Sequence, residues 1–172
     1  LSHGESEVEL CGPSGPGLGR DHLDRWGEGP LFAGYSSSRL DALADRLRAR
    51  GAAFLREGER LYVPDTTTFG FPMAIPPSAQ RPRVGPVSFL YEATNTLDTD
   101  WRTVAARYAD LFDLDASKFS PIGSERFGYE GTLTLFDPPA RLDRMALSQT
   151  FADRPSPMRR FVERRGGASL YR

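Results

Sequence analysis

The order strand, helix, strand, strand, strand occurs twice along this chain of 172 residues, and this repetition limits the fold more than any single motif. The first copy has an apolar run at 31–36, a helical pattern at 38–50 and strand-like runs at 53–55, 60–63 and 69–75. The second copy has a strand at 87–94, a helix at 99–114 and strands at 118–122, 129–136 and 142–149. Internal repetition of this kind indicates a fold built by duplication.

Both predicted helices carry their apolar residues on one face, which has to be buried against a sheet. Ser38 and Asp41 are expected to cap the first helix, Gly51 to end it, and Thr99 or Asp98 to cap the second. The predicted fold class is therefore α+β: paired βαβββ modules that form a curved mixed-sheet cup, with the helices on the outer face.

A second repeat involves the segments between modules. Residues 20–27 match 159–166 without a gap, and Val8–Leu10 corresponds to Met145–Leu147. We interpret 1–30 as the end of a preceding module with its connector, 31–77 as the first module and 78–86 as a linker. The second module is then 87–150, followed at 151–172 by a connector helix and the start of a further strand.

Composition narrows the class of protein further. The net charge is −1, so no global field favours nucleic acid or a membrane surface as a partner. Cys11 is the single cysteine and cannot form an internal disulfide, which suits a reducing compartment. Neither a signal peptide nor an apolar run of about 20 residues is visible. We expect a soluble cytoplasmic protein, and the abundance of alanine and arginine suggests a bacterial gene.

Several stretches in this order resemble the vicinal oxygen chelate superfamily, which includes glyoxalase I, bleomycin-resistance proteins, and extradiol and 4-hydroxyphenylpyruvate-type dioxygenases. The stretches that carry the resemblance are Arg25–Gly29, Arg39–Ala52, Arg126–Gly131, Arg141–Arg144 and Arg164–Gly166. The resemblance implies a cup that holds a divalent metal between a His at the start of a module's first strand and a Glu in its last strand.

This sequence departs from that ligand pattern. The first strands offer Leu31 and Phe32 in one module and Phe89 in the other, and the last strand reads Met145-Ala146-Leu147. The only histidines are His3 and His22, which lie outside both first strands. We therefore expect no metal and no other cofactor. A divalent metal such as Fe, Mn or Zn, in a site placed differently or completed across a dimer, remains the alternative.

Other constellations in the sequence favour plain structural readings. His3, Glu5, Glu7, Glu9, Cys11 and His22 match no compact metal site, although Glu9 could be a ligand completed by another chain. The glycine-rich stretch 12–19 lacks the lysine of a phosphate-binding loop. Cys11 and His22 are close in sequence, which is little evidence for a nucleophile and its base.

Aromatic residues on the predicted strands could line the cup instead of filling the core. The expected ligand-binding residues are Phe32, Tyr35, Phe89, Tyr91 and Tyr129, with Glu130 or Arg144 orienting the ligand. Glu92, Glu125, Glu130 and Arg144 are the acid–base candidates, and surface pairing of the acids with Arg126 or Arg144 is the alternative interpretation.

These features predict a small-molecule-binding protein similar to the bleomycin-resistance branch, with an aromatic or planar ligand in the cup. The alternatives are a metal-dependent dioxygenase, lyase or isomerase of the same superfamily, and a degenerate module that only supports assembly. Unpaired edges of the strand pieces Val8–Leu10 and Ser169–Tyr171 predict a homodimer.

Overall fold

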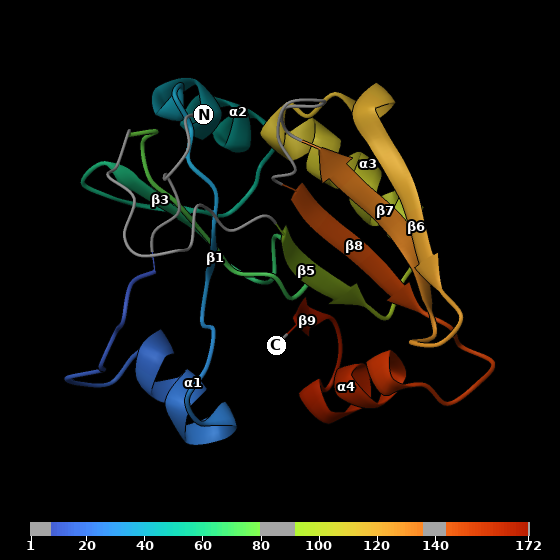
Figure 1. Ribbon diagram of the computed structural model, residues 1–172. Helices are drawn as coiled ribbons and strands as arrows, with labels where there is room; N and C mark the ends of the chain where they lie inside the picture. The colour runs from blue at the N-terminus through green and yellow to red at the C-terminus, as the bar shows by residue number, and fades with distance from the viewer. Residues whose placement is uncertain (1–7, 80–91, 136–143, 172) are drawn as a thin grey trace.

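The computed structural model describes residues 8–79, 92–135 and 144–171, which form two mixed sheets with helices around them (Figure 1). The four-stranded sheet has the order β1 (Ala33–Gly34), β4 (Met73–Ile75), β3 (Arg60–Val63), β2 (Leu55–Glu57). The five-stranded sheet has the order β6 (Phe119–Ser124), β7 (Tyr129–Leu135), β8 (Arg144–Thr150), β5 (Glu92–Leu97), β9 (Ser169–Leu170). The helices are α1 (Leu18–Trp26), α2 (Leu40–Ala49), α3 (Trp101–Phe112) and α4 (Pro157–Arg165), with a 3₁₀ turn η1 (Ala116–Lys118).

The two sheets share one topology, which confirms the α+β class and the repeated βαβββ unit. In each unit the first strand pairs in parallel with the last, β1 with β4 and β5 with β8, and the remaining pairs are antiparallel. The hydrogen bonds form two sheets rather than one continuous sheet. The reason is that β9 occupies the free edge of β5, while Leu170 N donates to Gly70 O of the first module.

The main helices form where the apolar stripes predict them, with different caps. Asp100 caps α3 by accepting a hydrogen bond from Thr103 N at 3.0 Å. Capping of α2 by Ser38 and Asp41 was a wrong prediction, since its N-cap is Arg39 and no side chain caps it. The backbone N–H groups in the first turn of α2 therefore lack the side-chain acceptor that the sequence predicted.

A single apolar core runs through both modules on the side of the sheets that α2 and α3 cover. Its largest fully buried members include Tyr108, Phe71, Leu47, Leu61, Met73, Leu97, Leu111, Met145 and Leu147. A buried polar joint crosses the core between the modules: Thr68 O accepts hydrogen bonds from Tyr108 Oη and from Asn95 Nδ2. A buried donor or acceptor that lacks a hydrogen-bond partner costs free energy, so this polar joint favours the one arrangement of the modules in which the hydrogen bonds form.

The connector repeat is visible as two helices of nine residues each, α1 and α4. They end at Gly27 and Gly166, whose φ angles of 73° and 72° favour glycine, and each leads into a short strand. Arg165 of α4 lies 4.0 Å from the ring centroid of Trp26 of α1. Residues 8–10 do not form the strand expected from the repeat, and Val8 and Leu10 are 87% and 93% exposed. The module bounds drawn from the sequence remain an interpretation.

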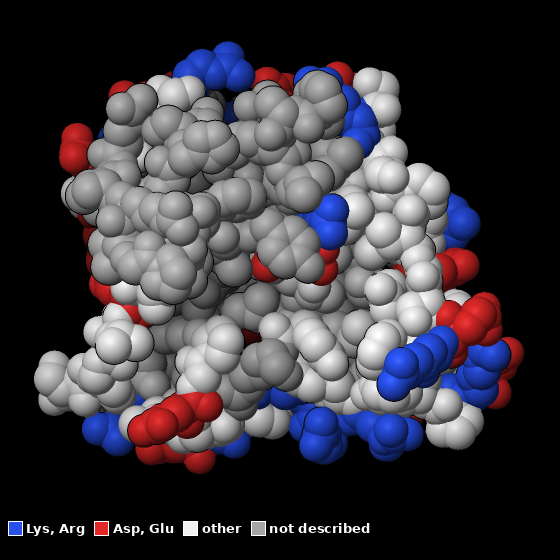
Figure 2. Space-filling model, viewed as in Figure 1, with Lys and Arg blue, Asp and Glu red and all other residues white. Residues whose placement is uncertain are grey.

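Among the described residues, no helix is both long and apolar enough to cross a membrane. The surface shown in Figure 2 carries basic and acidic side chains next to one another along its lower rim, where Figure 1 places α1 and α4. This rim therefore mixes charges of both signs.

Candidate functional site

Strand register assigns each side chain of the five-stranded sheet to one of its two faces. Asn95 on β5 hydrogen-bonds Tyr108 of α3, and Gln149 on β8 accepts from Trp101 N of α3, so these residues face the helix. Side chains alternate along a strand. Glu92, Thr94 and Arg144, which alternate with them, therefore lie on the opposite face. We call the strand faces turned away from α2 and α3 the ligand face.

Glu92 and Arg144 form an ion pair on the ligand face, where β5 and β8 begin. They are cross-strand partners in the parallel pair, and Arg144 Nε donates to Glu92 Oε2 at 2.8 Å. Thr94 Oγ1 donates to Glu92 Oε1 at 3.1 Å. The Glu92 and Arg144 side chains are 25% and 21% exposed, so water reaches the pair but does not surround it. An ion pair that is largely withdrawn from water is strongly oriented.

On the four-stranded sheet the ligand face carries an aromatic pair. Leu61 and Val63 of β3 are buried in the core, so Tyr62 points the other way and meets Phe32 with ring centroids 5.7 Å apart. The sequence singled out Phe32 but missed Tyr62. The alternation of β3 could have identified it, because Leu61 and Val63 are the apolar half of the strand. On the same face, Arg60 pairs with Glu9 at 2.7 Å.

The remaining predicted ligand-binding residues lie in different places. Tyr129 is on the ligand face, since it is the partner of Thr150, which alternates with Gln149 on β8. Glu130 is on the opposite face, where it accepts from Trp101 Nε1 at 3.3 Å, and it is 51% exposed. Phe89 and Tyr91 lie outside the described residues.

Tyr35 packs against the core on the helix side, and its hydroxyl is buried. Burial raises the pKa of this hydroxyl well above its ordinary value, and the nearby Tyr108 and Glu92 raise it further. Tyr35 is therefore a residue of the core rather than of the ligand face. The structure pairs Glu92 with Arg144 on the ligand face and places Glu130 on the opposite face.

Helix α4 covers the other end of the ligand face. It contacts β5 and β8, and Met158 N donates to Phe127 O at the β6–β7 turn. Its buried Met158, Phe161 and Val162 are not part of the core cluster around α3. In Figure 1, α4 lies below the ends of β5 and β8. Glu92 and Arg144 begin β5 and β8, at the opposite ends of these two strands.

The residues that the structure describes do not fit the divalent metal that the resemblance implies. The ligand-face residues of β8 are Arg144, Ala146, Ser148 and Thr150, and none is a carboxylate or imidazole. Glu92 is the single acid that β5 and β8 place on this face, and Arg144 already holds its carboxylate. Nowhere in the described part of the chain do three His, Cys, Asp or Glu side chains gather as a metal site requires.

Two further acids that the sequence singled out, Glu125 and Glu9, form ion pairs with arginines. Glu125 pairs with Arg154 rather than with Arg126. Glu9, besides its ion pair with Arg60, accepts a contact from Cys11 Sγ at 3.7 Å. Two surface hollows lie between loop 151–155 and α4, and between the start of α2 and the β2–β3 turn. Neither is lined by a residue that the sequence predicted to bind a ligand.

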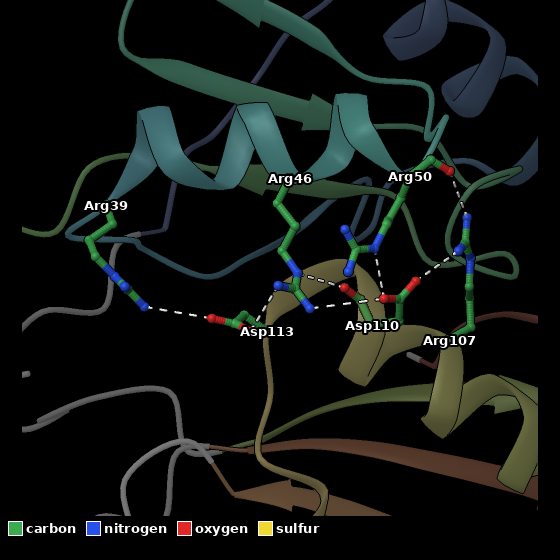
Figure 3. Close-up of polar contacts among 6 residues, drawn as sticks. All are labelled: Arg39, Arg46, Arg50, Arg107, Asp110 and Asp113. Atoms are coloured by element: carbon green, nitrogen blue, oxygen red, sulfur yellow. Dashed lines mark hydrogen bonds and ion pairs between the residues drawn. The ribbon is translucent and has the colours of Figure 1, made fainter.

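A second charged cluster ties the two modules together on the helix side (Figure 3). Arg46 donates to Asp110 O at 2.7 Å and pairs with Asp113 at 2.9 Å. Arg50 and Arg107 pair with the Asp110 carboxylate at 2.8 and 3.2 Å, and these arginines lower its pKa, Arg50 most strongly. We call this cluster the helix seam. Its groups bind one another across α2 and α3, which is a structural role.

Paired βαβββ modules with outer helices define the class of fold to which this chain belongs. One solved structure with this fold is a triple mutant of 4-hydroxymandelate synthase from Streptomyces coelicolor, with a TM-score of 0.65 and 18% sequence identity. The match covers 92% of this chain and 51% of that chain, so this chain spans about half the length of the synthase. No protein-family model matches the sequence, and no curated protein matches it.

Proposed function

We propose that this chain is a small-molecule-binding protein of the vicinal oxygen chelate superfamily that works without the family metal. It holds an aromatic or planar ligand on the ligand face, against Phe32 and Tyr62, with Arg144 as the polar anchor. The observation that carries the proposal is the ion pair of Glu92 and Arg144. It joins the first and last strands of the second module, the two strands on which the resemblance puts the metal ligands. A guanidinium there repels a cation instead of binding one.

Metal content and ligand response together test this proposal. Purified protein, dialysed against a chelator, is expected to contain far less than one equivalent of Fe, Mn or Zn by elemental analysis. A thermal-shift screen of planar aromatic compounds should then give stabilisation that is the same with and without added Mn²⁺, Fe²⁺ or Zn²⁺. A full equivalent of metal retained through dialysis would refute the metal-free proposal.

Substitutions on the ligand face locate the binding. Phe32→Asp places an unpaired charge on an apolar surface and is expected to abolish the thermal shift of a ligand found in the screen while the fold is kept. Phe127→Asp is the matched control, since Phe127 is 46% exposed at the β6–β7 turn. Phe89→Asp should act like Phe32→Asp, as the sequence predicts for that position. Equal ligand binding by wild type and Phe32→Asp would remove this site.

The second candidate is a metal-dependent dioxygenase, lyase or isomerase of the same superfamily. What favours it is the fold shared with a protein named as a synthase, which is an enzyme. That reading requires ligands from residues outside the described strands or from a partner chain. It predicts that one of the three metals stabilises the protein by several degrees and that this stabilisation survives Arg144→Ala.

A further inference from the structure

On the five-stranded sheet the ligand face carries one acid beside one base, Glu92 and Arg144, and this arrangement selects ligands by charge. Glu92 accepts from Arg144 Nε at 2.8 Å and from Thr94 Oγ1 at 3.1 Å. Two donors therefore hold the carboxylate in place. Because Arg144 lies opposite Glu92 in the strand register, the face presents a donor group and an acceptor group next to each other.

On the described strands of the five-stranded sheet, the two charges of the ligand face are opposite in sign. Along the described strands of the five-stranded sheet, every other side chain on the ligand face is uncharged. The Glu92 and Arg144 side chains are only 25% and 21% exposed. A ligand that introduced net charge here would have to compete with one member of the pair for its hydrogen bond to the other. Such a loss is costly where water is scarce.

We infer that the ligand is an uncharged planar molecule whose edge carries a hydrogen-bond donor beside an acceptor, as in an aromatic carboxamide or a lactam. The ligand's carbonyl accepts from Arg144, and its N–H donates to Glu92. A carboxylate would compete with Glu92 for the guanidinium, and an amidinium would compete with Arg144 for the carboxylate. This inference rests on the proposed function and specifies its ligand class.

Three probes of one shape and different charge test it: benzamide, benzoate and benzamidine. Titrations of the isotopically labelled full chain, followed by NMR, give a dissociation constant for each and show which residues respond. We expect benzamide to bind most tightly at residues 92–97 and 144–150. The two charged probes should bind about tenfold more weakly, because each breaks a charged hydrogen bond of the pair. Benzoate or benzamidine binding as tightly as benzamide would overturn the inference.

Single substitutions should move this preference in opposite directions. Glu92→Gln leaves an excess positive charge and should make benzoate the tightest probe, whereas Arg144→Gln should favour benzamidine. Glu163→Gln is the control, because the Glu163 carboxylate also accepts from an arginine, Arg159 Nε, at 2.8 Å, but on α4. It should keep the wild-type order. If either ligand-face variant fails to fold, the wild-type order of the three probes decides the matter.

The outcomes separate this inference from the proposed function. If all three probes bind at the ligand face and a charged one is preferred, the neutral-ligand inference fails and the binding site stands. If none of the probes perturbs residues 92–97 or 144–150 at millimolar concentration, the inference and the proposed site fail together. Shifts confined to other surfaces count as no binding at the ligand face.

Discussion

At the scale of single residues, Gly70 of the first module lies directly against the backbone of the carboxy-terminal segment. Its φ is +79°, and a Cβ there would lie 1.7 Å from Ala168 O. Gly70 O also accepts a hydrogen bond from Leu170 N of β9. The backbone conformation and the contact both require glycine, so this turn of the first module and β9 depend on each other.

Gly70→Ala is expected to lower the free energy of unfolding by about 3 kcal/mol, since strain and an overlap with backbone add together. Gly58→Ala is the matched control: its φ is +56°, but nothing lies within 4 Å of the added carbon. It should cost only about 1 kcal/mol. Urea denaturation of both variants measures the difference, and equal losses would contradict the close contact at Gly70.

The buried hydroxyl of Tyr108 predicts that the stability of the protein falls at alkaline pH. Burial raises the pKa of its hydroxyl, whereas in the unfolded chain a tyrosine titrates near pH 10. Stability is therefore unaffected by this group below about pH 10. Above that pH it falls by up to about 1.4 kcal/mol per unit, because unfolding releases a proton.

Tyr108→Phe removes the hydroxyl that donates to Thr68 O, so the variant's free energy of unfolding should be about 1–2 kcal/mol lower at neutral pH. Between pH 10 and 11 the free energy of unfolding should fall less for the variant than for wild type. Thermal melts over this range measure both effects. Tyr171→Phe, at a position 41% exposed, should follow the wild-type curve. A Tyr108→Phe curve parallel to wild type above pH 10 would speak against the buried hydroxyl.

At the scale of elements, the helix seam is the polar contact between α2 and α3. Asp110 accepts from Arg50 and Arg107, and Arg46 holds Asp113 at the end of α3. Arg107 Nη2 also donates to Arg50 O at the end of α2, at 3.4 Å. A carboxylate shared by several arginines forms a network, which contributes more to stability than an isolated surface pair.

Asp110→Asn should lower the melting temperature at low salt, and the loss should shrink in 1 M NaCl, where exposed charges are screened. Because the pKa of Asp110 is lowered, its contribution is present above its unfolded pKa near 4 and disappears as pH falls below that value. Asp45→Asn, which removes a single pair with Arg48, is the control. A deficit for Asp110→Asn that is equal in high salt and at pH 2 would show that the seam acts by packing alone.

At the scale of the whole molecule, assembly remains a prediction. The carboxy-terminal strand β9 is the edge strand of the five-stranded sheet: it pairs with β5 on one side, and on the other Leu170 N donates to Gly70 O. Residues 8–10 still expose two apolar side chains, Val8 and Leu10. Apolar side chains this exposed favour association when they meet a partner surface.

We expect light scattering to report a homodimer, and Leu10→Asp to shift it toward monomer by placing a charge in the contact. Ser14→Asp, a few residues along the same segment, is the control and should remain dimeric. A wild-type monomer at high protein concentration would contradict the assembly. It would leave the ligand face unaffected, since Glu92 and Arg144 belong to one chain.

The sequence by itself determined the order of the elements and the duplication, because apolar periodicity is a local property of each segment. It placed α2, α3 and β3 within a few residues. It offered Arg126 or Arg144 as a partner for the three glutamates, and the structure shows the pair of Arg144 with Glu92. Only the tertiary structure decided which face each strand residue occupies, because a shift of one residue reverses the face. That is why Glu130 lies against α3, while Arg144 lies on the ligand face. The place of β9 was also decided by distant contacts, since Gly70 and Leu170 are a hundred positions apart in the chain and meet only in the folded molecule.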